Sequence, residues 1–325
     1  MKLRNPSVLG ALAVVGLVAV YACGDEGSSG ADAGSDAMNT PVDAGGVSGD
    51  SGRWDASTTP MRPVMLNNVP CASPDIVLPA GWADKLVGAG FTKCVAPFGV
   101  IIAGPESVPD SYIDMVARIV GELLDPDMNG LANDPGVRGQ IAMGRNVWLP
   151  MPVDEESWLG GAEEALGREL GSYGIMIPSW WIGGFGPDEP NELAKQVMVE
   201  EVIHAFTQFG YAEEYPEIFG VSDWTSVIGR ETMRAQCDWW QHPENSCPGS
   251  PSMGGDCSDP SCDIVEFYQQ VLVLRAGMTP GWFGIGFPRD SDTLEGLLSD
   301  EIKAAMDDRM HNQLRQPLSF TYGQD

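Results

Sequence analysis

The chain has 325 residues, of which 46 are acidic and 18 are basic, and its formal net charge is −28 at pH 7. This charge argues against a nucleic-acid partner, because binding phosphates requires a basic surface. The sequence also lacks a Gly-x-Ser-x-Gly elbow and any Walker or Rossmann glycine pattern after a strand, which argues against a serine hydrolase of that type and against nucleotide binding.

Residues 1–22 predict a signal peptide. The basic start MKLR precedes the apolar run VLGALAVVGLVAVYA, which has signal-peptide length and ends in small residues. The following junction, VYAC, resembles a bacterial lipoprotein box, which implies a lipid on Cys23 that anchors the chain in the membrane of the cell envelope, on the periplasmic or outer surface. The alternative is an ordinary secretory signal. In both cases we expect the chain to leave the cytoplasm.

Residues 23–66 predict a disordered, lipid-anchored linker, because Gly, Ser, Ala, Asp and Pro dominate and leave almost nothing to bury. Such a chain behaves as a flexible coil. Residues 67–325 contain many Trp, Val, Ile and Leu and are long enough for one domain with a sizeable core. We therefore expect one folded domain that a tether holds away from the membrane.

The first part of this domain predicts alternating strands and helices. Segments rich in β-branched or aromatic residues predict strands at 92–104, 145–150 and 173–184. Apolar residues at helical spacing predict helices at 111–124 and 154–170. A further helix follows GPDEPNE, whose Pro and acidic residues are typical of a helix start.

The loop after the first of these helices, in LLDPDMNGLAND, carries alternating oxygen-bearing side chains. They belong to Asp125, Asp127, Asn129, Asn133 and Asp134. With Gly130 at the sixth place, this pattern resembles a short calcium loop, although Gly136 at the twelfth place excludes a full EF-hand. The alternative is a solvated acidic turn.

The segment VEEVIHAFTQFG, residues 199–210, matches four of the five letters of His-Glu-x-x-His, the helical motif that binds zinc through its two His. Glu200 replaces the first His, Glu201 takes the position of the general base, and His204 that of the second ligand. A carboxylate binds zinc at about the same distance as an imidazole, so Glu200 is chemically competent. Its negative charge should make the bound water less acidic.

Polar side chains of this predicted helix share one arc, into which Leu193 and Val197 intrude. A surface helix seldom places apolar residues in its wet face. We therefore expect the arc to line a cleft, where a divalent cation offsets the desolvation and repulsion of two carboxylates and an imidazole. The alternative is an amphipathic helix with a solvated acidic face.

The order of the predicted elements resembles a zincin-type metallopeptidase domain of the gluzincin branch. Strands and helices come first, the motif helix follows, and the remainder is largely helical. The resemblance implies an α+β fold with a small mixed sheet, a metal-site helix and a mainly helical, disulfide-bonded C-terminal part. It also implies a third zinc ligand on a later helix. Glu266, in the apolar segment CDIVEFYQQVLVLRAG, matches that position. His242 is the competing third ligand, and an exposed Glu on an amphipathic helix is the alternative for Glu266.

The activity that this resemblance implies is zinc-dependent hydrolysis of a peptide or protein substrate at the cell envelope, with Glu201 as the base. A catalytically inactive, zincin-like binding or scaffold lipoprotein is the alternative from a different functional class. The motif itself permits both, because a charged ligand in place of a His affects turnover more than metal binding.

The cysteines other than Cys23 form an even set in an oxidising compartment, which predicts three disulfides. They are Cys71, Cys94, Cys237, Cys247, Cys257 and Cys262. Their spacing does not select a pairing. A cysteine-zinc site is disfavoured, because CSDPSC lacks the two-residue spacing of a zinc knuckle and no second knuckle follows.

Overall fold

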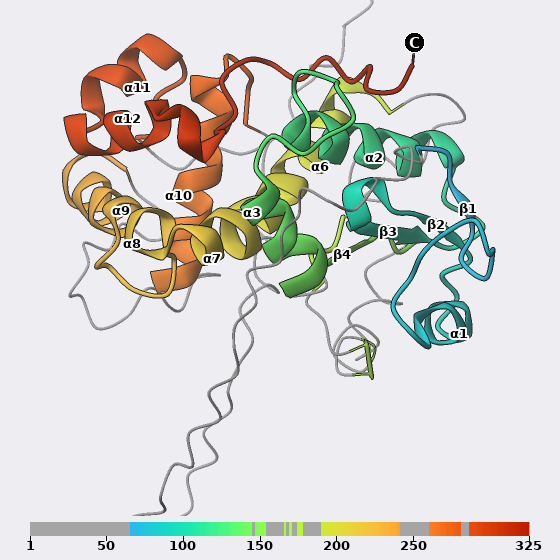
Figure 1. The fold of residues 1–325 in the computed structure, drawn as a ribbon. Helices are drawn as coiled ribbons and strands as arrows, with labels where there is room; N and C mark the ends of the chain where they lie inside the picture. The colour runs from blue at the N-terminus through green and yellow to red at the C-terminus, as the bar shows by residue number, and fades with distance from the viewer. Residues whose placement is uncertain are drawn as a thin grey trace, which may run out of the picture.

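The computed structural model describes residues 66–144, 147–153, 166, 169–170, 174–177, 190–240, 260–280 and 286–324. These residues form a mixed α+β fold with one small sheet and a majority of helices, as the sequence predicts (Figure 1). The predicted signal peptide, Cys23 and almost all of the linker lie outside the described residues. Among the helices that are described, none has both the length and the apolar composition needed to cross a membrane.

One four-stranded sheet has the order β1-β2-β3-β4. The strands are β1 (Val69–Pro70), β2 (Lys93–Val95), β3 (Ile101–Gly104) and β4 (Trp148–Pro150). β1, β2 and β3 pair in antiparallel fashion, whereas β3 and β4 are parallel, so the sheet is mixed. Residues 174–177 extend it beside β4, because the Ile175 and Ile177 N–H groups donate to the carbonyls of Trp148 and Pro150 at 3.1 and 2.8 Å.

The single strand predicted at 92–104 is wrong, because the chain reverses within it. β2 ends at Val95, a short 3₁₀ turn, η1 (Pro97–Gly99), follows, and β3 runs back antiparallel to β2. Phe98 and Gly99 have φ values of 53° and 90°. A positive φ is uncommon for a residue other than glycine, so the β-branched composition concealed this turn.

Helices make up most of the remaining described chain. The longer ones are α1 (Trp82–Gly88), α2 (Asp110–Leu124), α6 (Glu192–Phe206), α9 (Val227–Asp238), α10 (Pro260–Arg275), α11 (Ser291–Leu297) and α12 (Asp300–Asp307). The shorter ones are α3 (Pro135–Gly139), η2 (Gln140–Gly144), η4 (Thr207–Tyr211), α7 (Ala212–Glu214), α8 (Pro216–Phe219) and η5 (Arg309–His311). α2 and α6 confirm two of the predicted helices. Most of the helix predicted at 154–170 lies outside the described residues.

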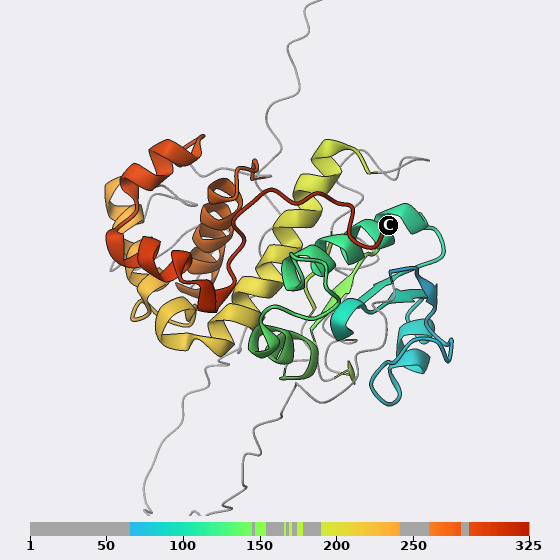
Figure 2. The same ribbon diagram turned by 45° about the horizontal axis from the view of Figure 1, so that its top comes forward.

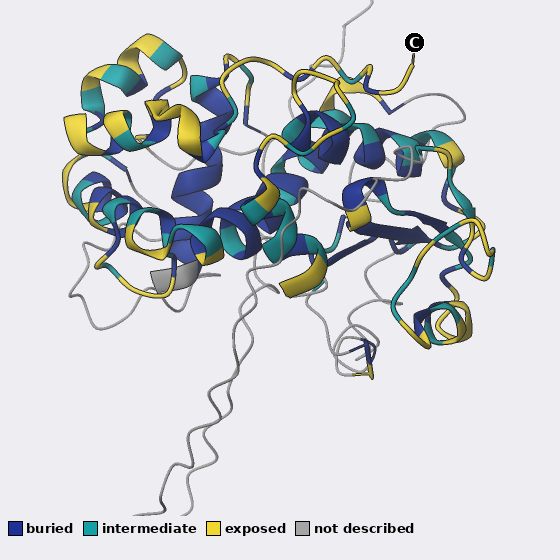
Figure 3. Cartoon of the chain, viewed as in Figure 1, coloured by how far each residue is buried: buried dark blue, intermediate teal, exposed yellow. Residues whose placement is uncertain are grey.

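β3 and β4 are buried on both faces of the sheet (Figure 3). Successive side chains of a strand point in opposite directions, so those of β3 enter two different cores. Ile101 and Ala103 belong to a small core with Trp82 and Leu86 of α1. Ile102 belongs to the large core, which also contains the buried side chains of α2, α6 and α10. The large core therefore lies on the side of the sheet opposite α1.

α6 lies between α2 and α10 (Figure 2). The side chain of Asn191 caps its first turn by accepting a hydrogen bond from the N–H of Ala194 at 2.9 Å. After Phe206 the helix continues through η4, a π-helical turn, into α7. Such turns are frequent at functional sites.

The disulfide Cys71–Cys94 joins the residue after β1 to β2 and confirms one of the three predicted disulfides, whose pairing the spacing left open. Cys237 of α9 and Cys262 of α10 are also disulfide-bonded. Cys247 and Cys257 lie outside the described residues. The last part of the chain is thus helical and disulfide-bonded, as expected.

Candidate metal centre

The part of the polar arc of α6 that carries the motif faces the protein. His204 and Thr207 are buried, and Glu200 and Glu201 are partly buried. Leu193, near the start of the helix in the same arc, is 52 % exposed, so only the later part of the arc is covered. From Glu200 to Thr207 the arc that carries the motif is therefore covered at least in part by the protein and is not a fully solvated acidic face.

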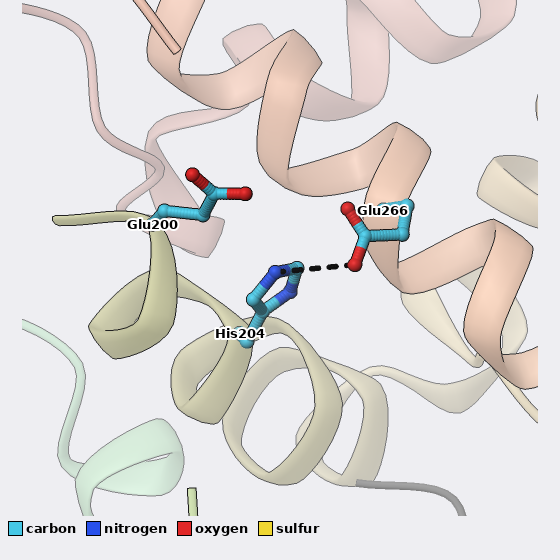
Figure 4. A group of neighbouring side chains, drawn as sticks. All are labelled: Glu200, His204 and Glu266. Atoms are coloured by element: carbon cyan, nitrogen blue, oxygen red, sulfur yellow. Dashed lines mark ion pairs between the residues drawn. The ribbon is translucent and has the colours of Figure 1, made fainter. Parts of the chain in front are cut away.

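Three side chains of the predicted zinc site converge between α6 and α10. Glu200 and His204 extend from α6, one turn apart, and Glu266 extends toward them from α10 (Figure 4). His204 Nε2 lies 3.4 Å from Glu266 Oε1. No two of the three nearest ligand atoms lie more than 4.8 Å apart.

These separations are compatible with one bound cation. Zinc ligands at about 2.1 Å from the metal lie roughly 3.4 Å from one another in a tetrahedral site, which is the separation between His204 and Glu266. Any pair as far apart as the 4.8 Å limit would need a small rotation of a side chain to bind the same ion. Glu200 has the most freedom to make this rotation, because it is the least buried of the three side chains.

Glu266 is only 2 % exposed, so the alternative of an exposed position on an amphipathic helix is wrong. Its neighbours at three and four positions along α10 are also polar and fully buried. They are Asp263, Gln269 and Gln270. Sequence reasoning missed this stripe, although polar residues that recur at helical spacing within an apolar helix are the signal for it.

Burial and mutual repulsion make the carboxylates of this site difficult to ionise. Burial raises the pKa of Glu200 to about 7. The pKa of Glu201 lies well above its usual value, first because of burial and then because of the negative charges of Glu200 and Glu266. A divalent cation would reverse both effects, because an opposite charge nearby favours the ionised form.

Comparison with protein families, with curated proteins and with solved structures found no match to this chain.

The identity of a bound ion therefore has to be inferred from the side chains that would coordinate it. One imidazole and two carboxylates suit zinc and other divalent first-row metals, whereas calcium prefers oxygen ligands alone. Among the described residues this group offers three ligand atoms, and three protein ligands with a fourth position for water are typical of a catalytic zinc site. His242, the competing third ligand, lies outside the described residues.

The residues of the predicted calcium loop are held largely by the protein. Asp125 is buried, and its carboxylate accepts hydrogen bonds from the N–H groups of Asn129 and Gly130 at 3.0 and 2.7 Å and from the Tyr322 hydroxyl at 2.5 Å. Asp134 caps α3 through the N–H of Val137 at 3.0 Å. The loop thus has a structural role that needs no ion, and calcium binding stays a prediction.

Asn129 and Asn133 take part in the same turn. The Asn129 amide donates to Asp127 at 2.9 Å, and the Asn133 N–H donates to the carbonyl of Leu124 at 2.7 Å. Asp127 and both Asn side chains lie on the exposed side of the loop. Any calcium would therefore bind through this outer edge.

Proposed function

We propose that this chain is a zincin-like, zinc-dependent peptidase in which Glu200, His204 and Glu266 hold the metal and Glu201 is the general base. The observation that carries the proposal is the convergence of three ligand-type side chains from α6 and α10, none of them exposed. Two of them occupy positions of the helical motif, and the third, Glu266, is the residue that the gluzincin resemblance implies. The chain folds with a small mixed sheet ahead of the motif helix, which is compatible with a zincin-type domain.

The assignment of Glu201 rests on its place beside the ligands. It follows Glu200 directly on α6, and its carboxylate is close enough to Glu200 and Glu266 for both charges to raise its pKa. A cation at this site would polarise the peptide carbonyl. The positive charge also favours the ionised form of Glu201, which can then take a proton from the attacking water and return it to the leaving amine.

The cellular setting of this proposal comes from the predicted signal peptide and lipoprotein box. A lipid on Cys23 would place the domain at the bacterial cell envelope, where the substrate is a peptide or protein outside the cytoplasm. The predicted linker would allow the domain to reach such substrates away from the membrane surface.

The test is a comparison of two Glu→Gln variants. Glu201→Gln should keep the metal content of the wild type and lose peptide hydrolysis, because an amide cannot accept the proton. Glu217→Gln, at an exposed position on α8, should keep both. Hydrolysis by Glu201→Gln at the wild-type rate rules out this base.

A second candidate, a metal-holding scaffold lipoprotein without turnover, is favoured by one observation. Glu200 brings a second negative charge to the site where a His would be neutral, so the cation becomes a weaker Lewis acid. Screening of metal-loaded wild type against a peptide library separates the two candidates. Stoichiometric metal without cleavage of any peptide supports the scaffold.

A further inference from the structure

The last described segment of the chain crosses the helices that carry the candidate metal ligands. Residues 312–324, here called the C-terminal strap, follow η5 and run across α6 to α2 (Figure 2). The strap contains no helix or strand. Its position is therefore set by contacts with the helices beneath it.

The strap first contacts the α10 region. The buried side chain of Gln313 accepts a hydrogen bond from the Tyr268 hydroxyl at 2.8 Å. Tyr268 follows Glu266 by two residues on the same helix. Further along, the Leu318 N–H points to the sulfur of Met278 at 3.4 Å, just after the end of α10.

The strap then contacts α6. The Lys195 ammonium lies 5.3 Å from the centre of the Phe320 ring, a cation–π arrangement. Lys195 lies five residues before Glu200 on α6. The strap thus contacts both of the helices that supply metal ligands.

The strongest contacts are with α2, where the buried carboxylate of Glu122 binds the strap backbone. It accepts hydrogen bonds from the N–H groups of Ser319, Thr321 and Tyr322 at 2.6, 2.9 and 3.3 Å, and from the Ser319 hydroxyl at 2.8 Å. Hydrogen bonds to an ionised carboxylate are stronger than neutral ones. Because this acceptor is buried, losing its donors would be costly.

Tyr322 completes the contact by fitting against a glycine. A Cβ atom built on Gly121 would lie 2.5 Å from the Tyr322 ring, which leaves room for hydrogen only. The Tyr322 hydroxyl reaches Asp125 at 2.5 Å, at the end of α2. The surface of α2 and its C-terminal end therefore contact the backbone N–H groups of the strap, the Tyr322 ring and the Tyr322 hydroxyl.

We propose that Gly121, Glu122, Asp125 and Lys195 form a recognition site for an extended peptide, which residues 319–322 of the same chain occupy, and that this occupancy anchors the strap across α6 and α10 so that the ligands meet. The second half of this inference rests on the proposed metal centre. Metal sites lose affinity when the orientation of their ligands is disturbed, and the strap contacts α10 two positions after Glu266 and α6 five positions before Glu200.

The test begins with the full chain and a variant that ends at Leu318. Zinc affinity is measured by competition with a chelating dye, and the synthetic peptide SFTYGQD, residues 319–325, is then added to the shortened variant. The shortened chain should bind zinc at least about tenfold more weakly. The peptide should bind to it and restore the affinity, whereas the same peptide with Tyr322→Ala should not.

A matched pair of glycine variants keeps the test decisive if the shortened chain fails to fold. Gly121→Ala pushes a methyl group into the Tyr322 ring, whereas Gly296→Ala on α11 meets nothing within 4 Å. Both changes remove the flexibility of a helical glycine. Gly121→Ala should therefore weaken zinc binding, and Gly296→Ala should not.

Equal zinc affinity of the full chain, the folded shortened chain and Gly121→Ala overturns the coupling to the metal centre. Failure of the peptide to bind to the shortened chain, measured by calorimetry without zinc, overturns the recognition site. If the full chain does not bind zinc, both the proposed function and the coupling of the strap to the metal centre are contradicted. Calorimetry of the peptide then still decides separately whether the recognition site exists.

Discussion

At the scale of single residues, the charge of Glu200 governs how strongly the candidate site can activate a substrate. The variant Glu200→His restores the neutral first ligand of the His-Glu-x-x-His motif. This variant should keep zinc and hydrolyse peptides faster than the wild type, because one fewer negative charge leaves the cation a stronger Lewis acid.

Zinc content and initial rates at equal metal loading measure this effect. Glu200→Gln is the matched control, since it removes the charge with little change in shape but is a poorer ligand. It should lose zinc affinity by about tenfold or more. A Glu200→His variant that binds zinc and is slower than the wild type would contradict the charge argument.

The raised pKa of Glu200 predicts how the stability of the metal-free protein depends on pH. The folded state holds this proton up to about pH 7, whereas the ordinary pKa is 4.5. Between these values the folded state binds more protons than the unfolded state, so the free energy of unfolding must fall as pH rises. Glu201, shifted in the same direction, extends the fall to higher pH.

Urea unfolding in the presence of a chelator, at about pH 5 and about pH 8, checks this sign. Glu200→Gln should reduce the difference between the two values, and Glu217→Gln should leave it as in the wild type. Saturating zinc should also reduce it, because the cation favours the ionised carboxylates. If the free energy of unfolding of the metal-free protein rises between about pH 5 and about pH 8, the buried, mutually repelling arrangement of these carboxylates is contradicted.

At the scale of elements, the turn after α2 depends on one buried carboxylate. Asp125→Ala removes the acceptor for two backbone N–H groups and for the Tyr322 hydroxyl. We expect a loss of at least about 2 kcal/mol in the free energy of unfolding, because buried donors are left unsatisfied. Asp127→Ala, at an exposed position of the same turn, should cost much less.

The same pair of variants decides whether calcium binds to this loop. If calcium binds at its outer edge, millimolar calcium raises the melting temperature of the wild type, and Asp127→Ala removes the increment. If the melting temperature does not change up to several millimolar calcium, which is above the range of about 10⁻⁴ to 10⁻³ M in which extracellular calcium loops bind, the loop is an acidic turn that the protein satisfies by itself.

At the scale of the whole molecule, the two cores on opposite faces of the sheet should be separable. The disulfide Cys71–Cys94 closes a span of 23 residues and lies in the small core with α1. Replacing both cysteines by Ser should cost about 2–4 kcal/mol of stability. Zinc affinity should stay within about twofold of the wild type, since the ligands lie in helices of the large core. A large loss of affinity contradicts this separation.

The sequence pattern predicts the parts of this molecule that depend on local spacing. The 3.6-residue period identifies α2 and α6, and the motif places Glu200 and His204 on one face of α6. The resemblance to gluzincins indicates Glu266, which contacts His204 across 62 positions of sequence. The reversal at Phe98 escapes prediction, because a positive φ at an aromatic residue has no compositional signal.

The strap is beyond prediction from the sequence for a different reason. Glu122 and its donors in residues 319–322 are about 200 positions apart, and nothing in SFTYGQD distinguishes it from a solvated tail. Gly121 looks like a weak point in a helix until the Tyr322 ring is seen against it. Such contacts are fixed by the packing of helices α2 and α6, which local patterns do not encode.

Metal analysis of the purified, oxidised chain tests the central claim most directly. At neutral pH the wild type should hold about one zinc ion per chain, and His204→Ala and Glu266→Gln should each remove it while remaining folded. Chelation should lower the melting temperature of the wild type and leave that of His204→Ala unchanged. A wild-type chain without stoichiometric metal, whose melting temperature does not respond to a chelator, would contradict the metal centre.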